Sequence, residues 1–108
     1  MAQNFRRFTS NNVGTGATTV LTANSFDTIV GISLANVTTN AITASCYIND
    51  GSKDIHFVKY VSIPSGSALQ VLDGGAKFVV QSGDALKVIS DTASSLDVWV
   101  SVVDAIST

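Results

Sequence analysis

The side chains that could carry catalysis are few in this 108-residue chain. It has a single histidine, His56, and a nucleophilic hydroxyl or thiol needs such a base beside it. His56 lies inside the alternating run DIHFVKY, on the face opposite Ile55 and Phe57. We therefore expect His56 to be a hydrogen-bonded or solvent-facing strand residue, and we expect the protein not to be an enzyme.

Two similar phrases, SGSALQV at 65–71 and SGDALKV at 82–88, place serine, glycine and aspartate at turns. Neither is a nucleophile elbow of the form G-x-S-x-G, because the second glycine is missing. Glycine permits a tight reversal, and a serine or aspartate oxygen can accept a hydrogen bond from a turn N–H. Leu69 with Val71, and Leu86 with Val88, would then share one face of the strand that follows. We interpret both phrases as architecture.

Metal and cofactor sites are not expected from the remaining polar residues. The aspartates occur singly, and DGSKD at 50–54 lacks the ligand spacing of an EF-hand loop. GTG at 14–16 is not a dinucleotide-binding glycine loop. The lone Cys46 excludes an intrachain disulfide and a cysteine cluster, and its alternation with Ile42 and Ala44 predicts a buried, unreactive thiol.

The tripeptide Asn36-Val37-Thr38 matches a glycosylation sequon. The opening MAQNFRRF has no apolar core of signal-peptide length, so we interpret the tripeptide as an Asx or Thr turn. No run approaches the length of a membrane span, and the net charge of −2 with a pI of about 4.9 argues against phosphate-held nucleic acid. We expect neither a membrane nor a nucleic acid as partner.

Exposed aromatic residues are better candidates for binding than for chemistry. Trp99 alternates away from the valine face of 96–102, and Tyr47 and Tyr60 also lie opposite the main apolar faces of their runs. Together these three could supply a carbohydrate- or receptor-binding pocket, and they equally suit a protein interface.

The N-terminal segment offers a second candidate contact. Phe5, Arg6, Arg7 and Phe8 combine apolar area with two forked hydrogen-bond donors. The first dozen residues lack alternation, so we expect residues 1–12 to form an extended arm outside the core, either disordered or ordered by a neighbouring subunit; our hypothesis is that a neighbouring subunit orders it. Such an arm could dock in a partner's acidic groove.

Period-two alternation dominates the rest of the chain and predicts strands. The expected strands are 17–22, 26–34, 41–49, 54–63, 68–72, 77–81, 85–90 and 95–103. Clusters of Asn, Asp, Gly and Ser separate them, and Pro64 ends one of them. An all-β fold follows: a single antiparallel β-sandwich domain of about eight strands over 13–108, of jelly-roll or immunoglobulin-like topology.

Three stretches resemble small structural proteins of tailed bacteriophages, particularly cyanophage-like marine phages: MAQNFRRFTSNNVGT, IPSGSALQVLDGGAKFVVQSGDALKV and SSLDVWVSVVD. The similarity extends over essentially the whole chain, and no catalytic residues come with it. It implies a virion protein, made in the host bacterial cytoplasm, that works by binding and repetition. The resemblance favours a capsid decoration or cement protein, assembled as a homo-oligomer, with a trimer favoured, on the major capsid protein. A tail, neck or fibre component is the alternative.

Overall fold

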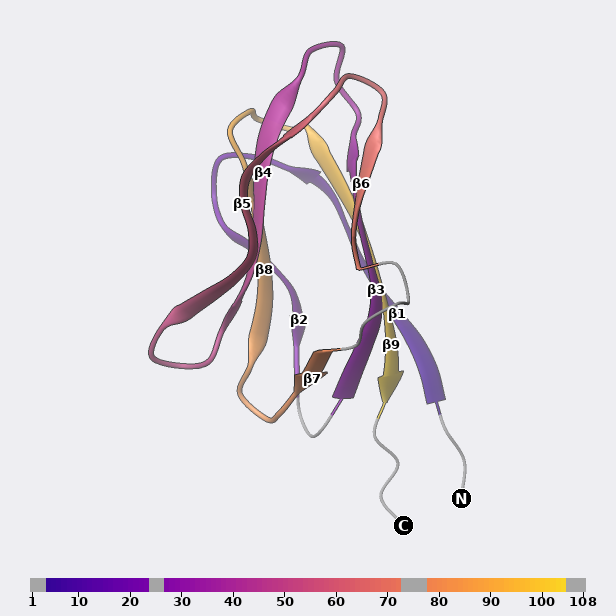
Figure 1. Ribbon diagram of the computed structural model, residues 1–108, viewed down its shortest axis with the longest axis vertical. Coiled ribbons are helices and arrows are strands. Elements are labelled where there is room, and N and C mark those ends of the chain that lie inside the picture. Colours follow the sequence, from indigo (N-terminus) through magenta and orange to yellow (C-terminus); the bar gives the residue numbers. More distant parts are fainter. Residues whose placement is uncertain (1–3, 24–26, 73–77, 105–108) are drawn as a thin grey trace.

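The computed structural model describes residues 4–23, 27–72 and 78–104, which form two packed β-sheets (Figure 1). Nine strands lie within these residues: β1 Asn4–Val13, β2 Thr18–Thr22, β3 Asp27–Asn36, β4 Ile42–Asn49, β5 Asp54–Ile63, β6 Ala68–Leu72, β7 Phe78–Val80, β8 Ala85–Ser90 and β9 Leu96–Asp104. One sheet has the order β1-β9-β3-β6, with β7 also paired to β3, and we call it sheet A. The other, sheet B, has the order β2-β8-β4-β5.

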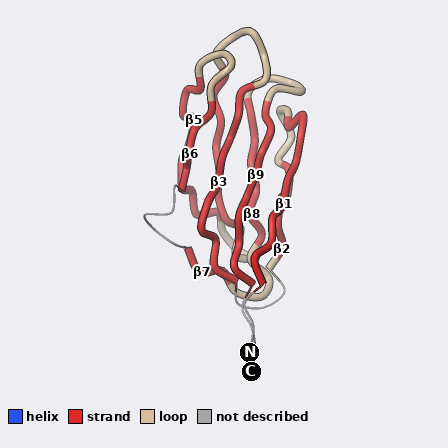
Figure 2. Tube along the Cα trace, turned by 90° about the vertical axis from the view of Figure 1, so that its right-hand side faces the viewer, coloured by secondary structure: helices blue, strands red, loops and turns tan. Residues whose placement is uncertain are grey.

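The strand pairs are nested along the chain. β1 pairs with β9, β2 with β8, β3 with β6 and β4 with β5, all antiparallel, as in one long hairpin rolled into two layers. The ladders β3–β9 and β4–β8 then complete sheets A and B. This order is that of a jelly roll, so the predicted all-β antiparallel sandwich is confirmed and its topology is decided. Figure 1 shows the two layers edge on, and Figure 2 shows the strands of sheet A side by side with sheet B behind them.

The core lies between the sheets and is built by alternation. In β9, and in β3 on either side of a register shift between Ile29 and Gly31, every second residue is buried, including Ile32, Leu34, Val98 and Val100. Cys46 is fully buried among them, as its place in the pattern predicts. Burying such aliphatic side chains supplies most of the drive for folding, at about 25 cal/mol for each Å² of apolar surface removed from water.

The N-terminal segment differs from the predicted arm. Residues 4–12 belong to strand β1, which pairs with β9 from Asn4↔Asp104 to Ser10↔Val98 and forms one edge of sheet A. Phe8 packs against the core opposite Val100. The alternation is hidden in the sequence because Arg6 stands on the core side of this strand, with its guanidinium carbon 5.2 Å from the centre of the Phe8 ring.

The two Ser-Gly turns carry the chain between the sheets. The turn at 64–67 leads from β5 in sheet B to β6 in sheet A, and the turn at 81–84 leads from β7 in sheet A to β8 in sheet B. Gly66 and Gly83 have φ values of 68° and 95°, which a residue with a Cβ rarely adopts. The Asp84 carboxylate accepts a hydrogen bond from the Gln81 N–H at 3.0 Å. The prediction that both Ser-Gly phrases form tight turns is confirmed.

Strand β5 departs most from its predicted pattern. Its register with β4 shifts twice, between Ala44 and Tyr47 of β4. The first shift places Tyr60 at φ 56°, with its N–H donating to the buried Ser45 Oγ at 2.9 Å. The second leaves Ile55 49% exposed, contrary to its expected place in the core. Phe57 instead stacks on Phe78 of sheet A, with ring centroids 4.3 Å apart.

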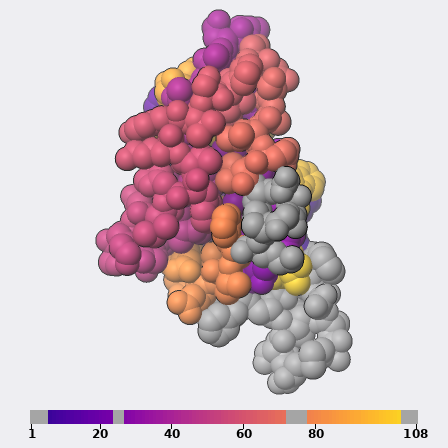
Figure 3. Space-filling model, viewed as in Figure 1, coloured from indigo at the N-terminus to yellow at the C-terminus, as the bar shows by residue number. Residues whose placement is uncertain are grey.

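The Phe57–Phe78 stack lies on the side of the sandwich that we call its open side, where the edge strand β5 of sheet B approaches the edge strands β6 and β7 of sheet A. The space-filling view shows residues of β5 and β6 meeting along this side (Figure 3). Because β5 is bulged and β6 and β7 are short, none of the three presents a long regular edge.

Candidate binding site on the outer face of sheet A

The three exposed aromatic residues expected to share a pocket lie on two different faces. Trp99 stands on the outer face of sheet A, whereas Tyr47 and Tyr60 belong to strands β4 and β5 of sheet B. Since the core separates the two sheets, a single pocket lined by all three does not form. Trp99 is 52% exposed, as its alternation with the buried valines of β9 predicts.

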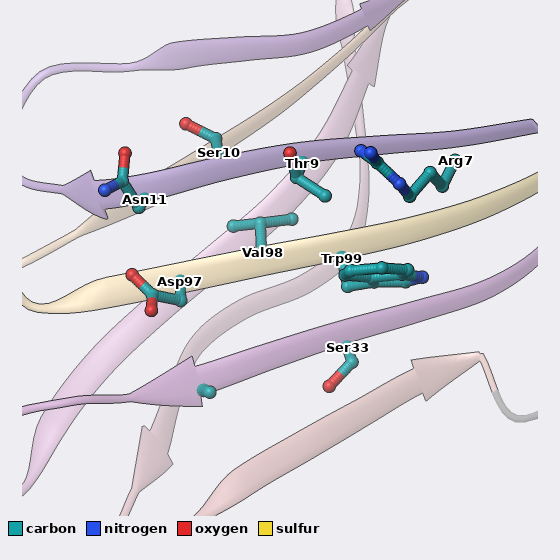
Figure 4. Close-up of a pocket in the computed structure, with 9 residues that line it drawn as sticks. Arg7, Thr9, Ser10, Asn11, Ser33, Asp97, Val98 and Trp99 are labelled. Carbon is teal, nitrogen blue, oxygen red and sulfur yellow. The ribbon is translucent and has the colours of Figure 1, made fainter.

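An open depression with a volume of about 520 Å³ surrounds Trp99 (Figure 4). Its lining comes from three neighbouring strands: Arg7, Thr9, Ser10 and Asn11 of β1, Asp97, Val98 and Trp99 of β9, and Ser33 and Ala35 of β3. Six of these nine lining residues have polar side chains, and Val98 is the buried residue beneath. The register sets Thr9 and Ser33 directly beside Trp99 on either side, and Ala35 beside Asp97.

The Trp99 ring contacts Arg7 of the neighbouring strand β1. The Arg7 guanidinium carbon lies over the ring, 5.4 Å from its centre, in a cation–π contact. Figure 4 shows the ring nearly edge on, between Arg7 on the β1 side and Ser33 on the β3 side. Ser33 and Ala35 of β3 have short side chains, so they leave space beside the face of the Trp99 ring that is turned toward β3.

Two hydrogen bonds fix the polar groups of this depression. Gln70 on β6 donates its amide N–H to Ser33 Oγ at 3.1 Å, which leaves the Ser33 hydroxyl proton to be directed elsewhere. The Asn12 N–H donates to one Asp97 carboxylate oxygen at 3.1 Å. A hydroxyl donor and a carboxylate acceptor therefore stand in fixed positions beside an exposed aromatic ring.

The N-terminal candidates are divided between the two sides of β1. Arg7 belongs to the depression, whereas Phe8 faces the core and Arg6 reaches over the Phe8 ring. Phe5 pairs with Val103 along the backbone ladder. These four residues thus do not form one docking surface.

The outer face of sheet B carries a smaller aromatic group. The Tyr47 and His56 rings, from paired positions of β4 and β5, lie 4.8 Å apart at a 33° tilt. His56 is exposed on its strand, as predicted. The Lys59 ammonium lies 5.4 Å from the centre of the Tyr60 ring, which is 72% exposed. A hollow of only about 70 Å³ lies beside Tyr60, too small for more than a few waters.

Reactive groups are held in structural roles where the chain is described. Burial raises the pKa of the Cys46 thiol to about 12, so it stays protonated at neutral pH. At the tip of the β4–β5 hairpin, the Asp50 carboxylate accepts hydrogen bonds from the backbone N–H groups of Lys53 and Ser52, and these bonds lower its pKa. Among residues 4–23, 27–72 and 78–104, no three acidic, histidine or cysteine side chains gather in a way that could hold a metal ion. Those residues also form no helix able to cross a membrane.

The chain is similar in fold to two crystal structures of a pentameric capsid protein isolated from metagenomic phage sequences. Each similarity covers 94% of this chain at 18% sequence identity, with a TM-score of 0.50. This chain spans only 60% and 62% of the length of those proteins. At this identity the similarity establishes the fold. No family model matches the sequence, and no curated protein matches it.

Sequence reasoning found Trp99 and Arg7 but missed Ser33, Gln70 and Asp97 as its companions. Ser33 alternates outward between Ile32 and Leu34, which is a usable signal. Its meeting with Gln70 depends on the pairing of β3 with β6, which no local pattern specifies.

Proposed function

We propose that this chain is a structural protein of a bacteriophage particle that acts through protein–protein contact and not through catalysis. The observation that carries the proposal is the nested jelly-roll pairing of this chain, a fold recurrent in viral capsids, together with a fold similarity to phage capsid structures that covers 94% of the chain. The resemblance of its sequence to tailed-phage structural proteins supports the same conclusion independently.

Within the particle, we propose the role of a decoration or cement protein on the head, bound to the major capsid protein. A compact sandwich with few charged residues suits a protein that adds to a finished lattice. A tail, neck or fibre component is the competing position, and it would use the same fold.

Strand β1 is the edge best suited to join one copy to another. It pairs with β9 through seven consecutive residues, Asn4 to Ser10, without a register shift. In an antiparallel edge strand, half of the backbone N–H and C=O groups point away from the sheet and can pair with a further strand. The three other sheet edges are bulged or short, so β1 offers the longest regular template for β-augmentation.

The number of subunits in the oligomer depends on which edge of the next copy the β1 edge pairs with. A β1 edge that pairs with a different edge of the next copy makes a heterologous contact, which forms a ring where the rotation between copies closes and an open filament where it does not. A trimer is the number favoured by the sequence resemblance, and a pentamer is the alternative suggested by the similar capsid structures.

Native mass spectrometry of the full chain, combined with hydrogen exchange, tests this assembly. We expect a ring of defined mass, and we expect the outward amides of 4–10 to exchange more slowly in the ring than after dilution to monomer. A monomer at all concentrations, or equal exchange at β1 in both states, would count against the β1 contact. Deleting residues 1–12 is not a suitable test, because it removes an entire strand and the Phe8 contact with the core.

The place in the particle needs a separate measurement. Antibody labelling of purified particles of the encoding phage, with quantitative mass spectrometry, should find the chain over the whole head in lattice-scale numbers. Labelling confined to the tail, with few copies, would favour the alternative position.

A further inference from the structure

We propose that the depression around Trp99 is a binding site for a neutral saccharide of one or two sugar rings. The proposal does not rest on the virion role, because it follows from the side chains of sheet A alone. It gives the outer face of this sheet a function separate from the β1 edge.

The first argument is the aromatic platform. Sugar rings carry an apolar C–H face that packs on an aromatic ring, and Trp99 presents such a ring at 52% exposure. Arg7 occupies the ring from the β1 side, which fixes its orientation and leaves the β3 side for a ligand. The short side chains of Ser33 and Ala35 leave room there.

The second argument is the pattern of polar groups around the platform. A sugar presents neighbouring hydroxyls that both donate and accept hydrogen bonds. The depression supplies matching partners in the Ser33 hydroxyl, positioned by Gln70, and the Asp97 carboxylate, positioned by the Asn12 N–H. Trp99 and Asp97 are two residues apart on one strand face, about 6.6 Å along β9, so one ligand can reach both.

The third argument concerns the competing occupant, a protein partner. The centres of protein interfaces are depleted of Asp and Ser, although aromatic residues and Arg are enriched there. Here the exposed ring and Arg7 are accompanied by Asp97, Ser33 and Thr9, and the adjoining Gln70 is polar too. This surrounding is unfavourable for a dry protein contact and favourable for a small polar ligand.

The chain supplies its own probe, because Trp99 is its single tryptophan. Titration of the full chain with lactose, maltose, cellobiose and chitobiose, followed by intrinsic fluorescence, reports directly on this ring. We expect a saturable change in emission with at least one of these disaccharides, at a Kd on the order of 1 mM. The absence of a saturable change with all four overturns the proposal.

Variants measured by calorimetry or NMR then locate the binding. We expect Trp99→Ala to weaken binding at least tenfold, and Ser33→Ala to weaken it by about threefold to tenfold through one lost hydrogen bond. The matched control is Tyr60→Asn, which removes an even more exposed aromatic ring from the opposite sheet and should leave the Kd unchanged. Equal loss in Tyr60→Asn, or no loss in Ser33→Ala, would show non-specific stacking and overturn the proposal.

Native mass spectrometry of the same variants distinguishes this inference from the proposed assembly. Trp99→Ala should leave the oligomer mass unchanged, since the ring lies on the face of sheet A and not at its β1 edge. A variant that loses oligomerisation while the parent binds no sugar would assign the depression to a protein contact instead.

Discussion

Asn36 is a buried polar residue whose replacement tests how the jelly roll is held together. It is 3% exposed at the end of β3. Its side-chain N–H groups donate to the carbonyl oxygens of Asn40 at 2.8 Å, Ile63 at 3.0 Å and Pro64 at 3.2 Å. Its side-chain oxygen accepts from the N–H and hydroxyl of Thr38 at 2.9 and 2.8 Å. The residue thus joins the β3–β4 loop to the chain where it crosses from β5 to β6.

The cost of Asn36→Ala follows from those contacts. The Ile63 carbonyl is the buried partner, and a buried acceptor left without a hydrogen bond costs about 1–3 kcal/mol. The part-buried partners can turn to water, so each adds less. We expect a loss of about 3 kcal/mol, a large share of the ~5–15 kcal/mol that stabilises a typical domain.

Asn36→Asp isolates the donated hydrogen bonds, because it keeps the size of the side chain. At pH 7 the introduced carboxylate faces carbonyl oxygens, and we expect about 1 kcal/mol more destabilisation than with alanine. These neighbours raise the folded-state pKa of the carboxylate above its unfolded value of about 3.9. A raised folded pKa favours the folded state at low pH, so the deficit should shrink as the pH falls from 7 toward 4.

Urea unfolding followed by the fluorescence of Trp99 provides the assay, at matched protein concentration. Asn40→Ala is the control, because Asn40 takes part in this network through its backbone and should lose little stability. If Asn36→Ala lies within about 0.5 kcal/mol of the parent, or if Asn36→Asp shows no pH dependence, the reasoning is refuted.

Three further predictions concern β4, β5 and the open side of the sandwich. Tyr60→Asn should raise stability by about 0.5–1 kcal/mol in urea unfolding, because asparagine tolerates the φ of 56° better; a loss would contradict the assigned strain. Cys46 should resist a thiol reagent at pH 8 until the protein unfolds, because its folded-state pKa is raised from 9.0 to about 12. The free energy of unfolding should therefore fall as the pH rises from 9 toward 12, because the thiol ionises in the unfolded chain before it ionises in the folded protein. This fall should be absent in Cys46→Ala. A double-mutant cycle of Phe57→Ala and Phe78→Ala should give a coupling of about 0.5–1.5 kcal/mol, whereas strictly additive losses would rule out the stack as an inter-sheet tie.

Local alternation was sufficient to locate most of the fold. The eight expected strands correspond to β2–β9, because most of them alternate between one buried face and one outer face, with the bulged strand β5 as the main exception. Strand β1 was missed because Arg6 occupies a core-side position, which a period-two pattern scores as polar. The choice between jelly-roll and immunoglobulin-like order was not accessible, since it depends on pairings such as β1 with β9 across most of the chain.

The candidate site was predicted only in part, because local alternation shows which side chains are exposed but not which strands become neighbours. The exposure of Trp99 follows from its own strand, and so does the turn made by Asn36, whose oxygen accepts from Thr38 as an Asx turn requires. The separation of Trp99 from Tyr47 and Tyr60 depends on which sheet each strand joins, and that is a property of the whole topology. The φ of Tyr60 was equally hidden, because a bulge arises from the mismatch between two strands.

The central claim is that this jelly roll is built into a phage particle. Electron cryomicroscopy of purified particles of the encoding phage, at a resolution that separates β-strands, tests it most directly. The account predicts the nested nine-strand sandwich as repeated density on the head lattice, with β1 at a contact between copies. Particles in which this density is absent, and from which mass spectrometry recovers none of the chain, would contradict it.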